Sequence, residues 1–228
     1  MFTKRYKFIS MMAVVLSCLL LLTGCGNQDA AKKKTLTVAT SGTLYPTSYH
    51  DPKTKKLTGY DVEVVRAIAK GLHKKVVFKE YSVDGMLTAV KTGKADMAVD
   101  DFAISPARKK NYLMSLPIKH SFNSIMVRAS DNSGINYLEK LALQADPNSG
   151  LKILPNMYFT TNEDGSGEGI VFNKKDKALQ KEVNQEISKL KKNGKLSKIA
   201  KKYYGADVTK KVKVKGLKHF TIKKTSDN

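Results

Sequence analysis

A pair of acidic residues stands shortly before an arginine in the segment Asp100 to Arg108, which reads DDFAISPAR. Ser105 and Pro106 are typical of the N-cap and first position of a helix, because the serine oxygen can accept a backbone N–H and proline needs none there. Arg108 would then lie in the first turn, where a cation opposes the helix dipole unless an anion sits beside it. The acids and the arginine together suit a zwitterion. The alternative is that Arg108 is simply the first of three basic residues on a solvated surface.

The apolar pattern around this segment predicts strands that alternate with helices. Strands are expected at 35–40, 75–80 and 95–99, and helices opened by Asp61 and Asp84 between them. This alternation indicates an α/β lobe with a mostly parallel sheet and flanking helices. In such sheets ligands bind outside the carboxyl ends of the strands. We therefore expect the site in the loops that follow the first and third strands.

The C-terminal part of the chain has the pattern of one further strand and two helices. The strand is expected at 169–172. Asp176 is positioned to cap a long amphipathic helix that Gly194 ends, and a second short helix runs on to Gly205. Residues 210–228 are rich in lysine and poor in core-forming residues, so we interpret them as a basic tail.

The first 24 residues have the pattern of a secretory signal peptide. Basic residues precede an apolar run from Met11 to Leu22, which is shorter than the ~20 residues that a membrane span needs. The end of the run, LTGC, resembles the bacterial lipobox, in which cleavage leaves Cys25 as the lipidated first residue at the outer face of the cell membrane. The alternatives are a plain signal peptide cut nearby and an uncleaved anchor. Residues 25–34 are polar and suit a tether.

Composition narrows the class of protein. The chain has 41 Lys and Arg against 20 Asp and Glu, a formal net charge of +21. Without a zinc pattern, a helix-turn-helix signal or basic residues interleaved with aromatics, nucleic acid is a weaker explanation than anionic lipid or wall polymer. Cys18 lies in the signal peptide and Cys25 would carry the lipid, so no disulfide is expected. The histidines show no ligand spacing, and no catalytic motif is present, so no metal, cofactor or enzymatic activity is expected.

Four motifs follow one another along the chain: LTGYDVE at 57–63, DGML at 84–87, KTGKAD at 91–96 and ISPAR at 104–108. Their order resembles that of the family 3 extracellular solute-binding proteins, the amino-acid receptors of ATP-driven (ABC) importers. The resemblance runs to about Arg128 and resumes from about Gly169 to Gly205. It implies a type II periplasmic-binding-protein-like fold in which two lobes close on a free amino acid. The implied partners are an ABC permease and an ATPase, and the implied state is a monomer.

The resemblance also implies which residues bind the ligand. Arg108 would grip the α-carboxylate, aided by backbone N–H groups near Ala103, and Asp101 would meet the α-ammonium, either through the backbone or by direct pairing. Tyr45 corresponds to an aromatic that stacks on the ligand, although a half-buried loop tyrosine is the alternative. Val83 falls where many members have a second aromatic. The implied ligand is a free amino acid, polar and cystine-like ones included. The complete set of expected ligand-binding residues is Tyr45, Val83, Asp101, Phe102, Ala103 and Arg108.

The second lobe of the family is strongly truncated in this sequence. Only 39 residues, 129–167, separate the two parts of lobe 1, which are expected at 35–128 and 168–209. This remnant has room for one helix at 137–145 and one strand at 151–154. Segments below ~40 residues seldom build a core without disulfides or metal. We therefore expect a lid in place of a lobe, and an open half-site.

Three functions are compatible with these observations. The leading hypothesis is a lipid-anchored, amino-acid-binding component of an importer, with capture weakened by the truncation. The alternative is a degenerate surface lipoprotein that binds anionic wall polymer or a protein partner and no solute. An enzyme is the third, because this fold occasionally hosts dehydratases, but no catalytic motif favours it.

Overall fold

The structure, a computed structural model, describes residues 33–120, 126–128, 151–153 and 167–211. The expected signal peptide, the lipid site Cys25 and all but the last two residues of the expected tether lie outside the described residues. The same holds for the helix expected at 137–145 and for the basic tail after Lys211.

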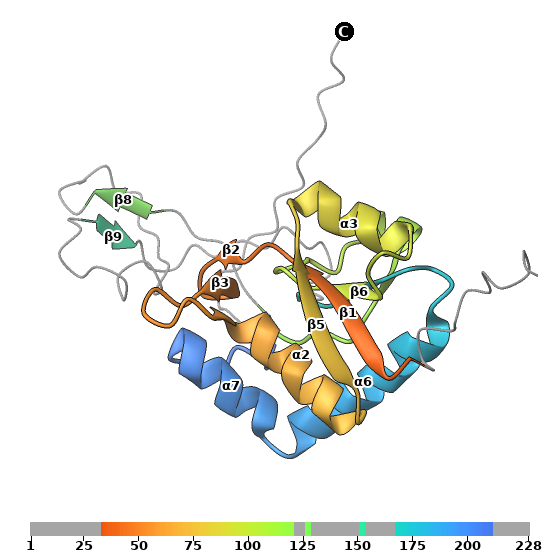
Figure 1. Cartoon of the computed structure of the whole chain (residues 1–228). Helices are drawn as coiled ribbons and strands as arrows, with labels where there is room; N and C mark the ends of the chain where they lie inside the picture. Colours follow the sequence, from red (N-terminus) through yellow and green to blue (C-terminus); the bar gives the residue numbers. More distant parts are fainter. Residues whose placement is uncertain (1–32, 121–125, 129–150, 154–166, 212–228) are drawn as a thin grey trace, which may run out of the picture.

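Five strands form the central sheet, in the order β5-β1-β6-β10-β7 (Figure 1). Their bounds are Thr35–Thr40 for β1, Lys75–Glu80 for β5, Met97–Ala98 for β6, Leu113–Met114 for β7 and Val171–Phe172 for β10. β1 is parallel to both β5 and β6, whereas β10 is antiparallel to β6 and β7. Four of the five strands therefore share one direction, and the prediction of an α/β lobe with a mostly parallel sheet is confirmed.

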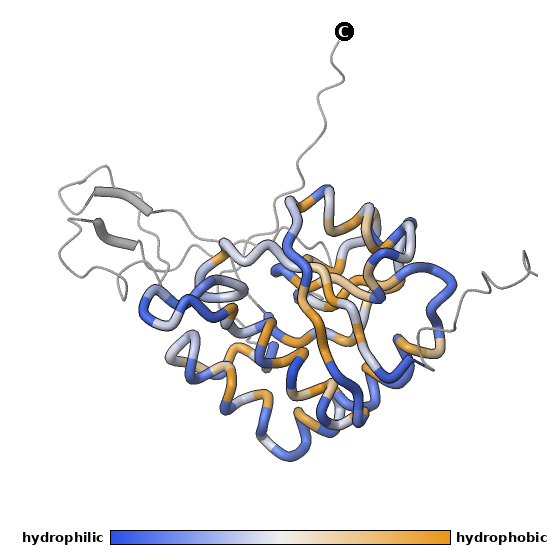
Figure 2. The backbone as a smooth tube through the Cα atoms, in the orientation of Figure 1, coloured by the Kyte–Doolittle hydropathy of each residue, from blue (hydrophilic) through white to orange (hydrophobic). Residues whose placement is uncertain are grey.

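Helices cover both faces of this sheet (Figure 1). Their bounds are Tyr60–Gly71 for α2, Val83–Lys91 for α3, Pro106–Asn111 for α4, Lys177–Lys192 for α6 and Lys195–Tyr204 for α7. The apolar sides of α2, α6 and α7 share one buried cluster with Leu36 and Val38 of β1, and α3 joins a second cluster with Ala39. Figure 2 shows the hydrophobic residues along the sheet and on the helix sides that face it. Full burial of each large aliphatic side chain contributes about 1.5–3 kcal/mol.

Two smaller ladders complete the described backbone. β2 (Thr43–Leu44), β3 (Ser48–His50) and β4 (Leu57–Thr58) form a three-stranded sheet, and β8 (Met126–Arg128) pairs antiparallel with β9 (Leu151–Ile153). β9 thus lies within the strand expected at 151–154, and residue 154 lies outside the described residues. β8 falls in the range expected for lobe 1 but pairs with a strand of the expected lobe 2 remnant. The division into lobes stays a prediction.

The cap of α2 differs from the one expected. Gly59, not Asp61, is the N-cap residue, and Asp61 lies buried in the first turn. Gly59 has φ 125°, and a Cβ there would meet the Thr47 carbonyl oxygen at 2.3 Å. Glycine is required because the backbone between β2 and β3 passes this closely, and the Asp61 N–H donates to the same Thr47 oxygen at 3.0 Å. The carboxylate of Asp61 is therefore available for another role.

Of the remaining caps, Ser105 and Asp176 stand where the sequence predicts, whereas the cap of α3 does not. Ser105 caps α4 as predicted, with its Oγ accepting from the Arg108 N–H at 3.2 Å and Pro106 at the first position. α3 is capped by Ser82 instead of Asp84, with the Gly85 N–H as donor at 3.3 Å. Asp176 occupies the N-cap of α6 but makes no capping hydrogen bond. These differences shift the helix starts by at most two residues from those predicted.

The chain that leaves the sheet after β7 runs beside the chain that returns to β10. The Ser115 N–H donates to the Ile170 oxygen at 2.9 Å, and the Ile118 N–H donates to the Glu168 oxygen at 2.9 Å. The Glu168 N–H in turn donates to the Lys119 oxygen at 3.0 Å. Residues 115–119 and 168–170 therefore pair as an antiparallel ribbon that extends the sheet.

Lys119, at the end of this ribbon, is the centre of a buried ionic cluster. Its side chain is 4% exposed, and its Nζ lies 2.5 Å from Asp101 Oδ1 and 3.1 Å from the Tyr204 hydroxyl. Burial alone would lower the pKa of Lys119, but Tyr204, Asp101, Asp61 and Glu168 together raise the pKa above its ordinary value. The lysine therefore stays charged, and it joins α2, α7, the ribbon and the loop after β6.

Replacing Lys119 by methionine should destabilise the fold strongly. The change keeps the aliphatic stem but leaves the carboxylate of Asp101 without its cation. Removal of one partner from a buried ion pair costs about 3–5 kcal/mol. Urea unfolding would measure this loss, with Lys198→Met as the control because Lys198 is exposed on α7. Equal unfolding free energies for the two variants would contradict the stabilising role of the Lys119 charge.

The pH dependence of stability should report on Asp61. Burial raises the pKa of Asp61 from 3.8 to about 7, although Lys119 and the Asp101 N–H lower it. Between these pH values the folded state keeps a proton that the unfolded chain has lost, so the Asp61 contribution to the unfolding free energy falls as pH rises. Asparagine cannot ionise. The unfolding free energy of the wild type relative to Asp61→Asn should therefore decrease from about pH 4 to pH 7, and a constant difference would refute this.

Candidate functional site

The loop after β6 carries the acidic pair of the sequence motif. Asp101 has a left-handed backbone with φ 60°, and its N–H donates to Asp61 Oδ2 at 2.9 Å. Its side chain pairs with Lys119. A non-glycine residue with positive φ is uncommon and needs such support from its surroundings. The turn therefore separates the two acids. Asp101 pairs with Lys119 in the ionic cluster, whereas Asp100 lies beside Ser41.

Arg108 is a half-buried cation at the start of α4. Its Nη1 donates to the Ala103 carbonyl oxygen, and its guanidinium lies over the Phe102 ring, 5.2 Å from the centroid. Burial lowers the pKa of Arg108, yet no carboxylate pairs with it among the described residues. The remaining N–H groups of its planar fork suit a bidentate carboxylate. The structure thus brings together three of the expected site residues, Phe102, Ala103 and Arg108.

Asp101 differs from the expectation of an acid aimed at the ligand ammonium. Its carboxylate already has a cationic partner in Lys119, at 2.5 Å. The side chain remains 36% exposed, so part of the carboxylate still faces outward. A ligand ammonium would share this acid with Lys119, which weakens the pairing that the sequence suggested.

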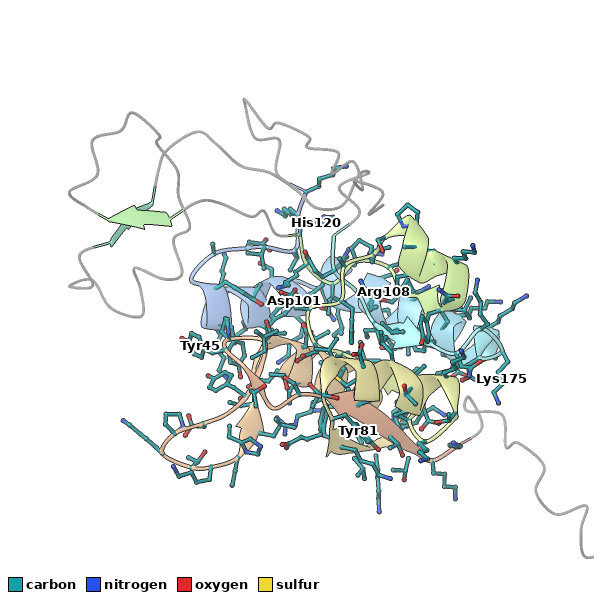
Figure 3. The ribbon with its side chains drawn as sticks, turned by 90° about the horizontal axis from the view of Figure 1, so that it is seen from above. Tyr45, Tyr81, Asp101, Arg108, His120 and Lys175 are labelled. Carbon is teal, nitrogen blue, oxygen red and sulfur yellow. The ribbon has the colours of Figure 1, made fainter. Side chains whose placement is uncertain are left out.

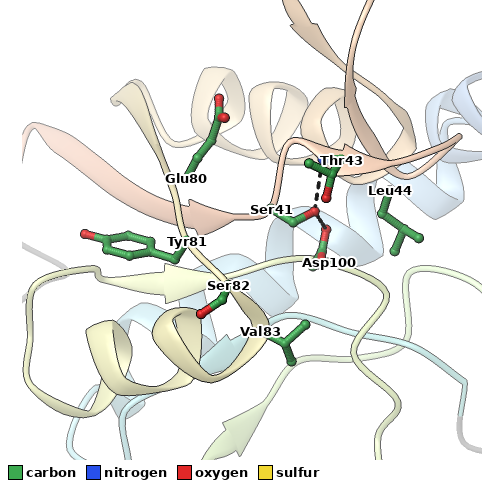
Figure 4. Close-up of a pocket in the computed structure, with 8 residues that line it drawn as sticks. All are labelled: Ser41, Thr43, Leu44, Glu80, Tyr81, Ser82, Val83 and Asp100. Atoms are coloured by element: carbon green, nitrogen blue, oxygen red, sulfur yellow. Dashed lines mark hydrogen bonds between the residues drawn. The ribbon is translucent and has the colours of Figure 1, made fainter.

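An open cleft of about 620 Å³ lies at the carboxyl ends of β1 and β5. Its lining residues are Ser41, Thr43, Leu44, Glu80, Tyr81, Ser82, Val83 and Asp100. Figure 4 shows Ser41, Asp100, Thr43, Leu44 and Val83 gathered on one side, whereas the side chains of Glu80 and Tyr81 point away. The position agrees with the general location of ligands in parallel sheets.

Asp100 is the half-buried carboxylate of this cleft. Its Oδ1 accepts from the Ser41 hydroxyl at 2.9 Å. Burial raises the pKa of Asp100, and the nearby Asp101 adds to the effect, while the hydrogen bonds from Ser41 oppose it. No basic residue pairs with it within the described part of the chain.

The two expected stacking positions are both exposed. Val83 is 55% exposed and lines the cleft. Tyr45 is 62% exposed and meets Tyr49 edge-on, with 4.9 Å between ring centroids. Tyr45 does not line the cleft itself, but its neighbour Leu44 does. Figure 3 shows Tyr45, Asp101 and Arg108 in a row across the lobe, with Asp101 in the middle.

Sequence reasoning missed two features of this site. The first is Lys119, which stands in an ordinary run next to Ile118 and gives no signal of burial. The second is the hydrogen bond between Ser41 and Asp100, two residues that are 59 positions apart. Only the adjacency of β1 and β6 brings these two together.

The described residues contain neither a metal-binding cluster nor a membrane-spanning helix. In these ranges no group of three or more His, Cys, Asp and Glu could hold a metal ion. None of the described helices has the length and apolar character needed to cross a membrane.

Relatives with similar sequences are binding proteins of transporters. The probable ABC transporter extracellular-binding protein YckB of Bacillus subtilis (strain 168) is 49% identical over 118 residues, which are 51% of this chain and 41% of YckB. A probable amino-acid ABC transporter-binding protein of Haemophilus influenzae is 42% identical over 102 residues, which are 45% of this chain and 39% of that protein. The chain thus matches about two fifths of the length of these two relatives. The L-cystine-binding protein TcyA of B. subtilis is 30% identical over 78% of this chain and 84% of TcyA.

Solved structures agree in fold. The crystal structure of YckB superimposes with a TM-score of 0.76 at 32% identity, over 86% of this chain and 100% of that chain. The L-cystine solute receptor of Neisseria gonorrhoeae, in its unliganded open conformation, gives a TM-score of 0.64 at 26% identity, over 81% and 98% of the two chains. The described lobe therefore has the type II periplasmic-binding-protein fold.

The sequence profile of one family matches most of the chain. It covers residues 36–206, which include the four motifs, the loop after β6 and the last two helices. The relatives named above are binding proteins or solute receptors by name. The chain therefore belongs to the bacterial extracellular solute-binding proteins, family 3.

Proposed function

We propose that this protein is the extracytoplasmic substrate-binding lipoprotein of an amino-acid ABC importer. The observation that carries the proposal is Arg108, a half-buried guanidinium over Phe102 that has no carboxylate partner among the described residues. A desolvated cation without a counterion is unfavourable in the unliganded protein, and a bound carboxylate relieves this. Family membership and the names of TcyA and the gonococcal receptor support a free amino acid as the ligand.

In this proposal the amino acid lies across the loop after β6. Its α-carboxylate binds the Arg108 fork beside Ala103, and its α-ammonium meets the exposed part of the Asp101 carboxylate. Tyr45 and Val83 provide exposed apolar surface for the rest of the ligand. The backbone N–H of Arg108 already donates to the Ser105 hydroxyl. This contact fixes the direction from which the guanidinium can reach a ligand.

The affinity depends on how much of the second lobe this chain retains. The alignment with YxeM of B. subtilis runs over 256 positions, more than the 228 residues of this chain, so YxeM contains residues without a counterpart here. We propose that they belong to the truncated segment 129–167. Ion pairs exposed to water contribute only about 0–1 kcal/mol each, so an open half-site binds weakly. Weak capture of an amino acid is the expected behaviour.

The N-terminal part of the proposal concerns anchorage. Lipidation of Cys25 would hold the protein on the outer face of the cell membrane, as a monomer next to its ABC permease and ATPase. Replacing Cys25 by alanine should abolish labelling with radioactive palmitate and release the protein from the membrane fraction of a bacterial host. Cys18→Ala is the matched control and should keep the label. Retention of the label in Cys25→Ala would contradict this site.

Arg108 is the residue whose loss should affect binding most. Arg108→Met removes the charged hydrogen bonds that this half-buried guanidinium makes to the ligand carboxylate. Such bonds are each worth about 1.5–3 kcal/mol, more than an ion pair fully exposed to water, so the Kd should rise roughly tenfold or more. Calorimetry of the purified full chain against a panel of L-amino acids and L-cystine would measure this. Lys110→Gln, an exposed change in the same helix, is the control for loss of positive charge.

The same titrations decide between the two candidate functions. An amino acid that binds the wild type and loses affinity in Arg108→Met supports the receptor. Binding that is equal in Arg108→Met and Lys110→Gln would exclude Arg108 as the carboxylate site. No binding by any member of the panel would favour the degenerate surface lipoprotein, for which the net charge of +21 suggests anionic wall polymer as the partner.

A further inference from the structure

Asp100 differs from three buried or half-buried carboxylates of this basic chain that pair directly with a lysine. Asp96 pairs with Lys33 at 2.7 Å, Asp101 with Lys119 at 2.5 Å and Glu186 with Lys189 at 2.5 Å. Asp100 has only the Ser41 hydroxyl at 2.9 Å and no basic partner within the described ranges. A partly buried carboxylate ordinarily acquires a cation. This chain has 41 Lys and Arg, yet none of those in the described ranges pairs with Asp100. The unpaired carboxylate therefore indicates a binding site for a ligand cation.

The cleft around Asp100 suits a particular shape of cation. Leu44 and Val83, which are 39% and 55% exposed, present aliphatic surface on the wall where Asp100 and Ser41 lie (Figure 4). Glu80, the other acid of the lining, is already engaged with His50 at 2.8 Å, and its side chain points away. A methylene chain that ends in a nitrogen cation would bury its stem against the two aliphatic residues and place its charge at Asp100.

We propose that Asp100, with Ser41, binds a cationic group at the end of the ligand side chain, so that the substrate class is the basic L-amino acids. The proposal rests on the proposed function, because it takes the α-carboxylate to be held by Arg108. Arg108 is not among the residues that line the cleft, so the cleft extends away from the end where the α-carbon lies. The α-ammonium is therefore assigned to Asp101 and the side-chain cation to Asp100.

Two ligands of matched shape test this assignment. L-Lysine and L-norleucine share the α-ammonium, the α-carboxylate and a four-carbon side chain, but only lysine ends in an ammonium group. Calorimetry of the purified full chain should show lysine binding more tightly than norleucine. Asp100→Asn is nearly isosteric and can still accept a hydrogen bond from Ser41. This change should raise the Kd for lysine roughly tenfold or more and change the Kd for norleucine less than about twofold. Asp84→Asn, an exposed acid on α3, is the control.

The other outcomes overturn the inference in distinguishable ways. An equal loss of affinity for lysine and for norleucine in Asp100→Asn would place the ligand α-ammonium at Asp100. No loss for either ligand, with binding still dependent on Arg108, would show that Asp100 does not contact the ligand while the receptor function stands. Absence of binding to lysine, norleucine and the whole amino-acid panel would remove the proposed function itself. Thermal unfolding of each variant would verify that the fold is intact.

Discussion

The charge on Lys119 is the interaction on which the rest of this lobe depends. The lysine is almost completely buried at the point where the chain leaves the central sheet, and it pairs with Asp101 and lies by Asp61 and Tyr204. These partners come from the loop after β6, the first turn of α2 and the last turn of α7. One buried cation therefore ties together segments that are far apart in sequence. A buried charge is tolerated only with such partners, which makes their relative positions specific.

The distribution of paired and unpaired charges separates structure from candidate function. Asp101 looks like a binding residue in the sequence, yet its carboxylate takes part in the ionic cluster and holds the left-handed turn of its own loop. That turn leaves Asp100 in the cleft beside Ser41, and leads into the segment in which Arg108 lies over Phe102. Along the sequence, Asp100 and Arg108, which have no ionic partner in the described residues, thus stand on either side of Asp101, the acid that Lys119 neutralises. The electrostatics of a ligand with separated charges match this arrangement.

Much of the fold could be predicted because it depends on local patterns. Residues 35–40 and 75–80 are strands with the predicted bounds, and Ser105 caps its helix as expected. The prediction that Asp61 caps α2 was wrong. Gly59 takes the cap position because the backbone of Thr47, twelve residues earlier in the sequence, passes close to it. The strand expected at 95–99 is shorter for a related reason, since a ladder needs partners and only Met97 and Ala98 pair with β1.

The sequence by itself determined the alternation of strands and helices, the family motifs and the presence of acids and an arginine in one segment. These follow from residue spacing, which acts over a few turns of chain. The tertiary structure alone decided which acid is neutralised, since Lys119 reaches Asp101 only through the ribbon formed with residues 168–170. It also decided that Ser41 meets Asp100, because β1 lies beside β6. Pairing over such separations depends on the packing of the whole lobe, and no local pattern encodes it.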